Sequence, residues 1–170
     1  TVNGADINVA GDAVFAASGM ITLDDQWNDF GGQVTVDAQD FVLAAQDDVL
    51  LFDVDVDELT VTTTGSIFDG MDGDIVVAGN ASFTGSAITI GNDAGNTVNF
   101  GTLTFSSSGS VDLTEDSSML ISGASSAGAG LDLVSASDVT LAASVTVVGD
   151  TNITAGTTVG SIDVNAKLNG

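Results

Sequence analysis

The residues best suited to chemistry in this sequence are aspartates that alternate with glycines. Asp69, Asp72 and Asp74 lie within six residues, together with Gly70 and Gly73. Calcium takes several oxygen ligands from a loop that can wrap around the ion, and glycine permits the sharp turns that such a loop needs. We therefore expect weak calcium binding here, with an ordinary acidic turn as the alternative. The spacing does not fit an EF-hand, whose ligands extend over about twelve positions and end in a glutamate.

A second glycine-bearing segment, residues 91–96, contains Asp93 as a further candidate calcium ligand. Its composition is faintly similar to the Gly-Asp repeat of calcium-binding β-rolls. The pattern does not recur every nine residues, which disfavours that class of protein. Calcium is the one cofactor that the sequence leads us to expect.

Trp27 is the single tryptophan, and it stands among polar residues in the segment 24–29. An exposed tryptophan beside carboxylates can stack on a sugar ring, so Trp27 is a candidate ligand-binding residue. It could equally cover one end of an apolar core, because the terminal units of a repeat protein need a cap. We favour the capping interpretation.

Asp53, Asp55 and Asp57 alternate with valines. In a strand, this alternation places the three carboxylates on one face and the valines on the other. The carboxylates could form a ladder that binds cations. We expect instead a solvent-facing strand whose like charges deter edge pairing.

Catalysis is disfavoured by the absence of reactive side chains. The chain has no histidine, cysteine or tyrosine, and Lys167 is its single basic residue. Most pairs of nucleophile and base, including the Ser-His-Asp arrangement, cannot be built from what remains. A glycosidase that uses two carboxylates stays formally open. Because aspartates commonly occupy turns and solvated strand faces, we predict a non-enzymatic protein.

The charge balance excludes two classes of partner. Twenty-four acidic residues against one basic residue give a net charge of −23. Nucleic acids and anionic membrane surfaces both need lysine and arginine to neutralise phosphate, so neither is expected as a partner. The apolar runs are also much shorter than a membrane-spanning helix, and membrane insertion is not expected.

Short segments that read apolar, polar, apolar dominate the sequence. This two-residue period is that of a strand with one buried face, and the residues between the segments are those of tight turns. Hydrophobic residues make up 44% of the chain, which suffices for a core. The sequence therefore predicts an all-β fold. The segments are 21–23, 34–36, 59–61, 88–90, 103–105, 131–133, 145–147 and 162–164.

An internal repeat favours a β-solenoid. Residues 6–15 match residues 74–83, with Phe15 aligned to Phe83, and a third copy follows at 145–153. Taken from Asp6, Asp74 and Ser144, the starts of the units lie 68 and 70 residues apart. Three coils of roughly 23 residues fill such a unit, which is within the range of stacked repeats. We thus expect one parallel β-solenoid over 1–170 of about seven coils, built from units at about 6–73, 74–143 and a partial 144–170. Small sandwich domains in tandem are the alternative.

Several stretches of the second half carry a resemblance to a known class of protein. Residues 96–105, 109–117 and 131–136 resemble large repetitive bacterial exoproteins of the filamentous-haemagglutinin-like type. The resemblance implies a right-handed parallel β-helix, export across an envelope, and a role in adhesion, surface coating or biofilm. Residues 42–58 depart from the later copy, being richer in aspartate and in bulky apolar residues.

We therefore predict a structural or adhesive segment of a secreted cell-surface or extracellular filament protein. Its expected partners are further copies of itself, joined head to tail or laterally, and a surface glycan or protein. A calcium-dependent glycan-binding or protein-binding module is the alternative function.

Overall fold

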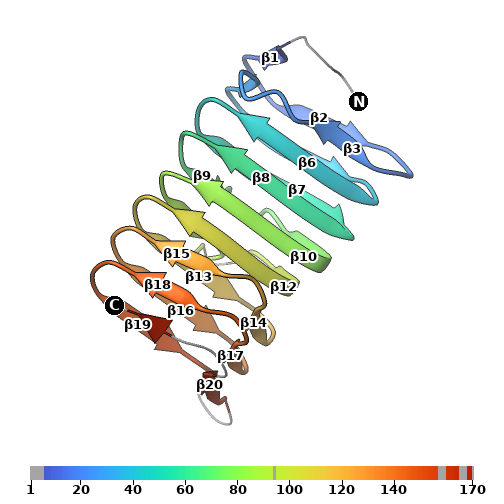
Figure 1. The fold of residues 1–170 in the computed structure, drawn as a ribbon. Helices are drawn as coiled ribbons and strands as arrows, with labels where there is room; N and C mark the ends of the chain where they lie inside the picture. The colour runs from blue at the N-terminus through green and yellow to red at the C-terminus, as the bar shows by residue number, and fades with distance from the viewer. Residues whose placement is uncertain (1–5, 94, 157–159, 165–167, 170) are drawn as a thin grey trace.

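The computed structural model describes residues 6–93, 95–156, 160–164 and 168–169. Over these residues the chain is built from strands without a helix, and it forms a parallel β-solenoid of about 8 turns (Figure 1). The predicted fold class is confirmed, with about one coil more than expected. All the alternating segments named above lie in strands. The strands are β1 (Asn8–Val9), β2 (Ala13–Ala16), β3 (Ile21–Leu23), β4 (Asp29–Phe30), β5 (Gln33–Asp37), β6 (Asp40–Ala45), β7 (Val49–Val56), β8 (Glu58–Thr63), β9 (Ile67–Asp69), β10 (Ile75–Gly85), β11 (Ile88–Ile90), β12 (Val98–Ser107), β13 (Val111–Glu115), β14 (Met119–Ile121), β15 (Ser125–Ala127), β16 (Leu131–Ser135), β17 (Val139–Leu141), β18 (Val145–Val147), β19 (Thr151–Thr154), β20 (Ile162–Val164) and β21 (Leu168–Asn169).

The repeating element is a single coil of variable length. Each strand pairs in parallel with a strand of the next coil, and the two form one column of the stack. Register partners lie from 17 residues apart, as Val34 and Leu51 do, to 23 apart, as Ile75 and Val98 do. The predicted 23 residues per coil is thus the upper end of the observed range.

The core consists of apolar ladders that run along the stack. In one of them each side chain lies opposite the next in the following coil, and every member is at most 1% exposed. The alternation within each strand produces this arrangement, because every second side chain points inward. The members of this ladder are Phe41, Leu59, Ala81, Leu103, Ile121 and Leu141.

Buried hydroxyl groups satisfy the backbone where the chain turns between strands. The hydroxyls of Thr63, Ser107 and Ser135 each accept a hydrogen bond from the amide two residues further on. Each also donates to a carbonyl of the previous coil. A buried carbonyl or amide without a partner is costly, so these small polar residues stabilise corners that are closed to water.

The longer unit does not correspond to equivalent positions in the stack. Phe15 lies opposite Val36, whereas Phe83 lies opposite Val61 and Phe105 in another column. The alignment of Phe15 with Phe83 is therefore wrong as a structural equivalence. The unit boundaries stay a prediction, and part of the third unit, including Lys167, lies outside the described residues.

One column of the solenoid ends at β12. In the upstream coils Val36 lies opposite Val54, Val54 opposite Ile75, and Ile75 opposite Val98. Among the pairings of the described strands, none continues this column beyond Val98. The rest of β12 pairs onward with two shorter strands, β14 and β15.

Shortening a side chain of the inner ladder is expected to destabilise the protein. Leu103→Ala removes buried apolar contacts and leaves a cavity, so we predict that the free energy of unfolding falls by about 2–5 kcal/mol. Urea denaturation followed by circular dichroism measures this change. The control is Val14→Ala, because Val14 is 74% exposed. Equal unfolding midpoints for the two variants would contradict the assignment of Leu103 to the core.

Candidate functional site

The two glycine-bearing acidic segments lie against each other in successive coils. The Asn96 side-chain amide donates to Oδ2 of Asp69 at 2.9 Å and to the Gly70 carbonyl at 3.0 Å. The Asn96 side-chain oxygen accepts from the amide of Asp72 at 2.8 Å. The structure thus brings together two loops that the sequence analysis treated separately.

Two of the predicted calcium ligands already accept hydrogen bonds from the chain. Asp69 lies opposite Leu51 and is 7% exposed, and its Oδ2 also accepts from the Gly91 amide at 2.8 Å. Oδ1 of Asp74 accepts from the Thr97 amide at 2.8 Å. These carboxylates link adjacent coils.

The remaining two predicted ligands lie in the same pair of loops. Asp72 adopts a left-handed backbone conformation with φ of 63°, which suits the tight turn between Gly70 and Gly73. Asp93 is half-buried. Among the described residues, no group of three or more carboxylates is placed to hold a metal ion. Calcium binding stays a prediction.

Trp27 is 57% exposed, so the expectation that it covers the apolar core is wrong. The neighbouring Asn28 is the buried residue of this loop. Its side-chain amide donates to the carbonyls of Leu23 and Ala44, and its side-chain oxygen accepts from the amide of Ile7. Asn28 thus joins three segments, while the Trp27 ring remains accessible to a ligand.

The alternating segment 53–57 faces solvent as expected. Asp53 and Asp55 are exposed, and the valines between and after them are buried. The strand is not at an edge, however, because β7 pairs with β5 on one side and with β10 on the other. Its charges therefore do not serve to prevent edge pairing. Asp55 instead lies opposite Asp37 in the neighbouring coil.

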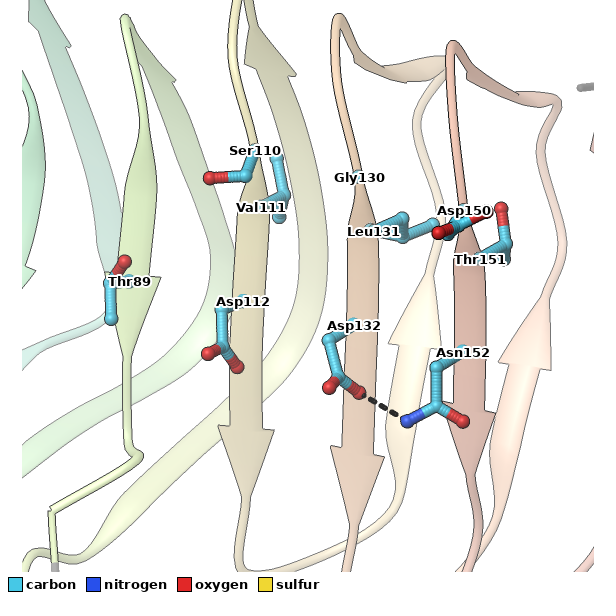
Figure 2. Close-up of a pocket in the computed structure, with 10 residues that line it drawn as sticks. All are labelled: Thr89, Ser110, Val111, Asp112, Gly130, Leu131, Asp132, Asp150, Thr151 and Asn152. Atoms are coloured by element: carbon cyan, nitrogen blue, oxygen red, sulfur yellow. Dashed lines mark hydrogen bonds between the residues drawn. The ribbon is translucent and has the colours of Figure 1, made fainter.

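A polar ladder on the outer face of β11, β13, β16 and β19 lines a hollow of about 380 Å³ (Figure 2). Thr89, Asp112, Asp132 and Asn152 lie opposite one another in successive coils. Asn152 donates to Oδ1 of Asp132 at 2.9 Å. The sequence showed both aspartates between apolar residues, but periodicity alone did not place them side by side.

The environment of Asp112 disfavours its charged form. Burial raises the pKa of this carboxyl above the ordinary 3.8, and the charge of Asp132 raises it further, against a hydrogen bond from Asn92 that lowers it. Like charges directly opposite each other in a sheet are destabilising. This ladder is thus a place where bound cations would be favourable.

Other carboxylates serve as links between coils. Oδ1 of Asp12, Asp48 and Asp138 accepts a backbone amide of the neighbouring coil at 3.0, 2.7 and 2.8 Å respectively. For Asp138, hydrogen bonds from the side chain and amide of Ser161 lower the carboxyl pKa. Aspartate suits this role because its short side chain accepts hydrogen bonds from nearby backbone. The excess of aspartate over glutamate thereby acquires a structural explanation.

Comparison with known proteins gives a family but no activity. Residues 1–37 and 38–104 each match a family described as repeats of unknown function (DUF5649). The chain belongs to this family. The second match is close in length to the unit predicted from the sequence, although it begins at another residue. No curated protein and no solved structure matches the chain. The described residues also include no helix with the length and apolarity of a membrane span.

Removing the charge of Asp132 is expected to make Asp112 more acidic. In Asp132→Asn one source of repulsion is lost, so the pKa of Asp112 should fall while burial still keeps it above the ordinary value. Carbon-detected NMR titration of the side-chain carboxyls measures the shift. Asp55→Asn, on another column, is the control and should leave Asp112 unchanged. An identical titration of Asp112 in Asp132→Asn and the wild type would contradict the coupling.

Proposed function

We propose that this protein is a non-enzymatic structural and adhesive segment of a secreted cell-surface or extracellular filament protein. Support comes from the uninterrupted stack of coils, whose interior is filled by apolar side chains. The family consists of repeats, and stacked repeats form long surfaces rather than enclosed reaction sites. The observation that carries the proposal is an apolar layer in the last described coil that no described strand covers.

This layer belongs to the last described coil. Ile162, Val164 and Leu168 are 50%, 46% and 39% exposed. Their register partners in the preceding coil are completely buried. The partners are Val139, Leu141 and Val145, respectively. The exposed side chains thus continue core ladders, and no strand among the described residues covers them.

The opposite end also has free hydrogen-bonding edges. Among the described pairings, β2 and β3 each have a neighbour on one side, namely β5 and β6. An unpaired strand edge is a template for another chain. Both ends therefore favour addition of a further coil, and a second copy of this chain supplies matching apolar ladders. We propose head-to-tail association, in which the first coil of one copy covers the last coil of another.

The resemblance to filamentous-haemagglutinin-like exoproteins supports export and an extracellular location. The net charge of −23 fits this proposal, because like-charged rods repel each other along their sides and stay apart. Divalent cations that bind acidic faces, such as the Asp112–Asp132 ladder, would reduce that repulsion. Lateral contacts between rods are thus proposed to depend on cations.

A charge in the uncovered layer is expected to weaken self-association. Val164→Asp places a carboxylate where the next coil would pack, and its burial without a partner is costly. Sedimentation velocity at increasing protein concentration, in buffer with millimolar calcium, should show assemblies for the wild type and fewer for the variant.

Val76→Asp is the matched control, because Val76 is exposed on β10, which pairs with strands of both neighbouring coils and so lies away from either end of the stack. This variant should assemble as the wild type does. A wild-type protein that stayed monomeric at all concentrations would refute head-to-tail association by this segment.

A second candidate function is calcium-dependent binding of a glycan or protein, and the exposure of Trp27 favours it. We expect Trp27→Ala to lose binding to a glycan array, since the stacking surface for a sugar ring disappears. Calcium should strengthen wild-type binding relative to chelator at fixed ionic strength. Met20→Ala is the control, because Met20 is similarly exposed. Array signals unaffected by Trp27→Ala and by chelator would exclude this function.

A further inference from the structure

Glu115 is a carboxyl group in a core position. It ends β13, whose residues alternate between buried and half-buried, and it is 1% exposed. The chain has one other glutamate, Glu58, which is exposed. A buried carboxyl in a strand interior is costly unless its oxygens find partners or it takes up a proton.

The two carboxyl oxygens of Glu115 differ in their hydrogen bonding. Its Oε1 accepts hydrogen bonds from the Phe100 amide at 3.2 Å and from the Ser117 hydroxyl at 2.8 Å. Its Oε2 is enclosed, and no partner for it exists among the described residues. Burying a charged oxygen without a partner costs much more than burying a neutral hydroxyl without one, so this geometry favours the protonated acid.

The position of Glu115 coincides with the place where one column of the solenoid ends. Val98 and Phe100 lie in the strand segment that ends this column. The Val98 amide donates to Oδ2 of the adjacent Asp116 at 2.9 Å, and the Asp116 amide donates to the Val98 carbonyl at 2.9 Å. The carboxyl groups of Asp116 and Glu115 thus accept the backbone amides that a further strand would otherwise accept.

We propose that Glu115 is a proton-controlled latch: protonated, it closes the free edge of β12 at Val98–Phe100, and ionised, it releases that edge to solvent. The geometry at Val98–Phe100 supports this assignment. An ionised Glu115 can leave its pocket only by giving up its hydrogen bond to Phe100, and water then has access to the end of the column. This device is independent of the proposed adhesive function.

The charges around Glu115 make ionisation more difficult. Asp116 adds a neighbouring negative charge. Of the strands that pair with β13, β11 carries no titratable residue and β16 carries Asp132, which lies opposite Asp112. The strand β12 also carries none. Lys167, the single basic side chain of the sequence, lies outside the described residues.

Burial is the largest influence and raises the pKa of Glu115 from 4.5 to about 7, against the hydrogen bonds from Phe100 and Ser117. The folded protein therefore binds this proton more tightly than the unfolded chain. The stabilisation is complete below the ordinary pKa of glutamate, decreases as the pH rises, and is lost above about pH 7. The latch thus operates between mildly acidic and mildly alkaline conditions.

Hydrogen exchange of the Val98 and Phe100 amides tests the latch directly. After correction for the intrinsic effect of pH on exchange, we expect protection in the wild type to fall about tenfold between pH 6 and pH 8. In Glu115→Gln, which is neutral throughout, protection should stay constant. Glu58→Gln is the matched control, since the Glu58 carboxylate also accepts a backbone amide, that of Asn80 at 3.1 Å, but is exposed. This variant should retain the wild-type dependence on pH.

Equal pH dependence in Glu115→Gln and the wild type would overturn the proposal, as would its loss in Glu58→Gln. A second measurement does not require any variant to fold. With glutamate selectively labelled with ¹³C at the carboxyl carbon, the wild-type protein gives two side-chain resonances, one for each glutamate. One of the two should titrate near pH 7. The absence of any resonance that titrates above the ordinary range of glutamate would refute the latch.

Discussion

The parallel hydrogen-bond ladder between successive coils is the constraint on which the rest of this structure depends. Each strand takes its backbone partners from the coils before and after it, so the coils must keep their register along the whole stack. Side chains of one column then lie one above another, as Phe41, Leu59 and Ala81 do. The same stacking that aligns apolar side chains inside also aligns charged ones outside. Cohesion of the core and repulsion on the surface are thus two results of one geometry.

The acidic side chains also contribute to the hydrogen bonding between coils. Strand ladders leave amide groups unpaired at corners, and the carboxylates of Asp48, Asp74 and Asp138 accept amides there from the neighbouring coil. The side chains of Asn28 and Asn96 also link separate segments of the chain, because each both donates and accepts hydrogen bonds. The chain has no cysteine. Its corners are held instead by short polar side chains that act across coils.

The period of the apolar residues was enough to predict the strands and the solenoid, because burial of alternate side chains is a local property of the sequence. What sequence reasoning missed depends on which residues become neighbours across coils. Phe15 and Phe83 share a local pattern but occupy different columns, since coil length varies. Trp27 was expected to cover one end of the core because terminal coils need a cap, whereas it is 57% exposed and the neighbouring Asn28 is buried with three hydrogen bonds. The sequence pattern did not single out Glu115, because its role depends on the column of strands that ends at β12.

The variable coil has a mechanical consequence. Hydrogen bonds between coils run along the axis of the stack, while the chain itself passes from one coil to the next at a single corner. A force that pulls the two ends apart therefore loads one terminal coil at a time, instead of shearing many bonds together. Each coil that unwinds releases from 17 to 23 residues, and an extended chain of this length spans about 60–80 Å. Under tension the protein would therefore lengthen in steps of unequal size. The coil whose edge is closed by Glu115 would unfold at a force that depends on pH.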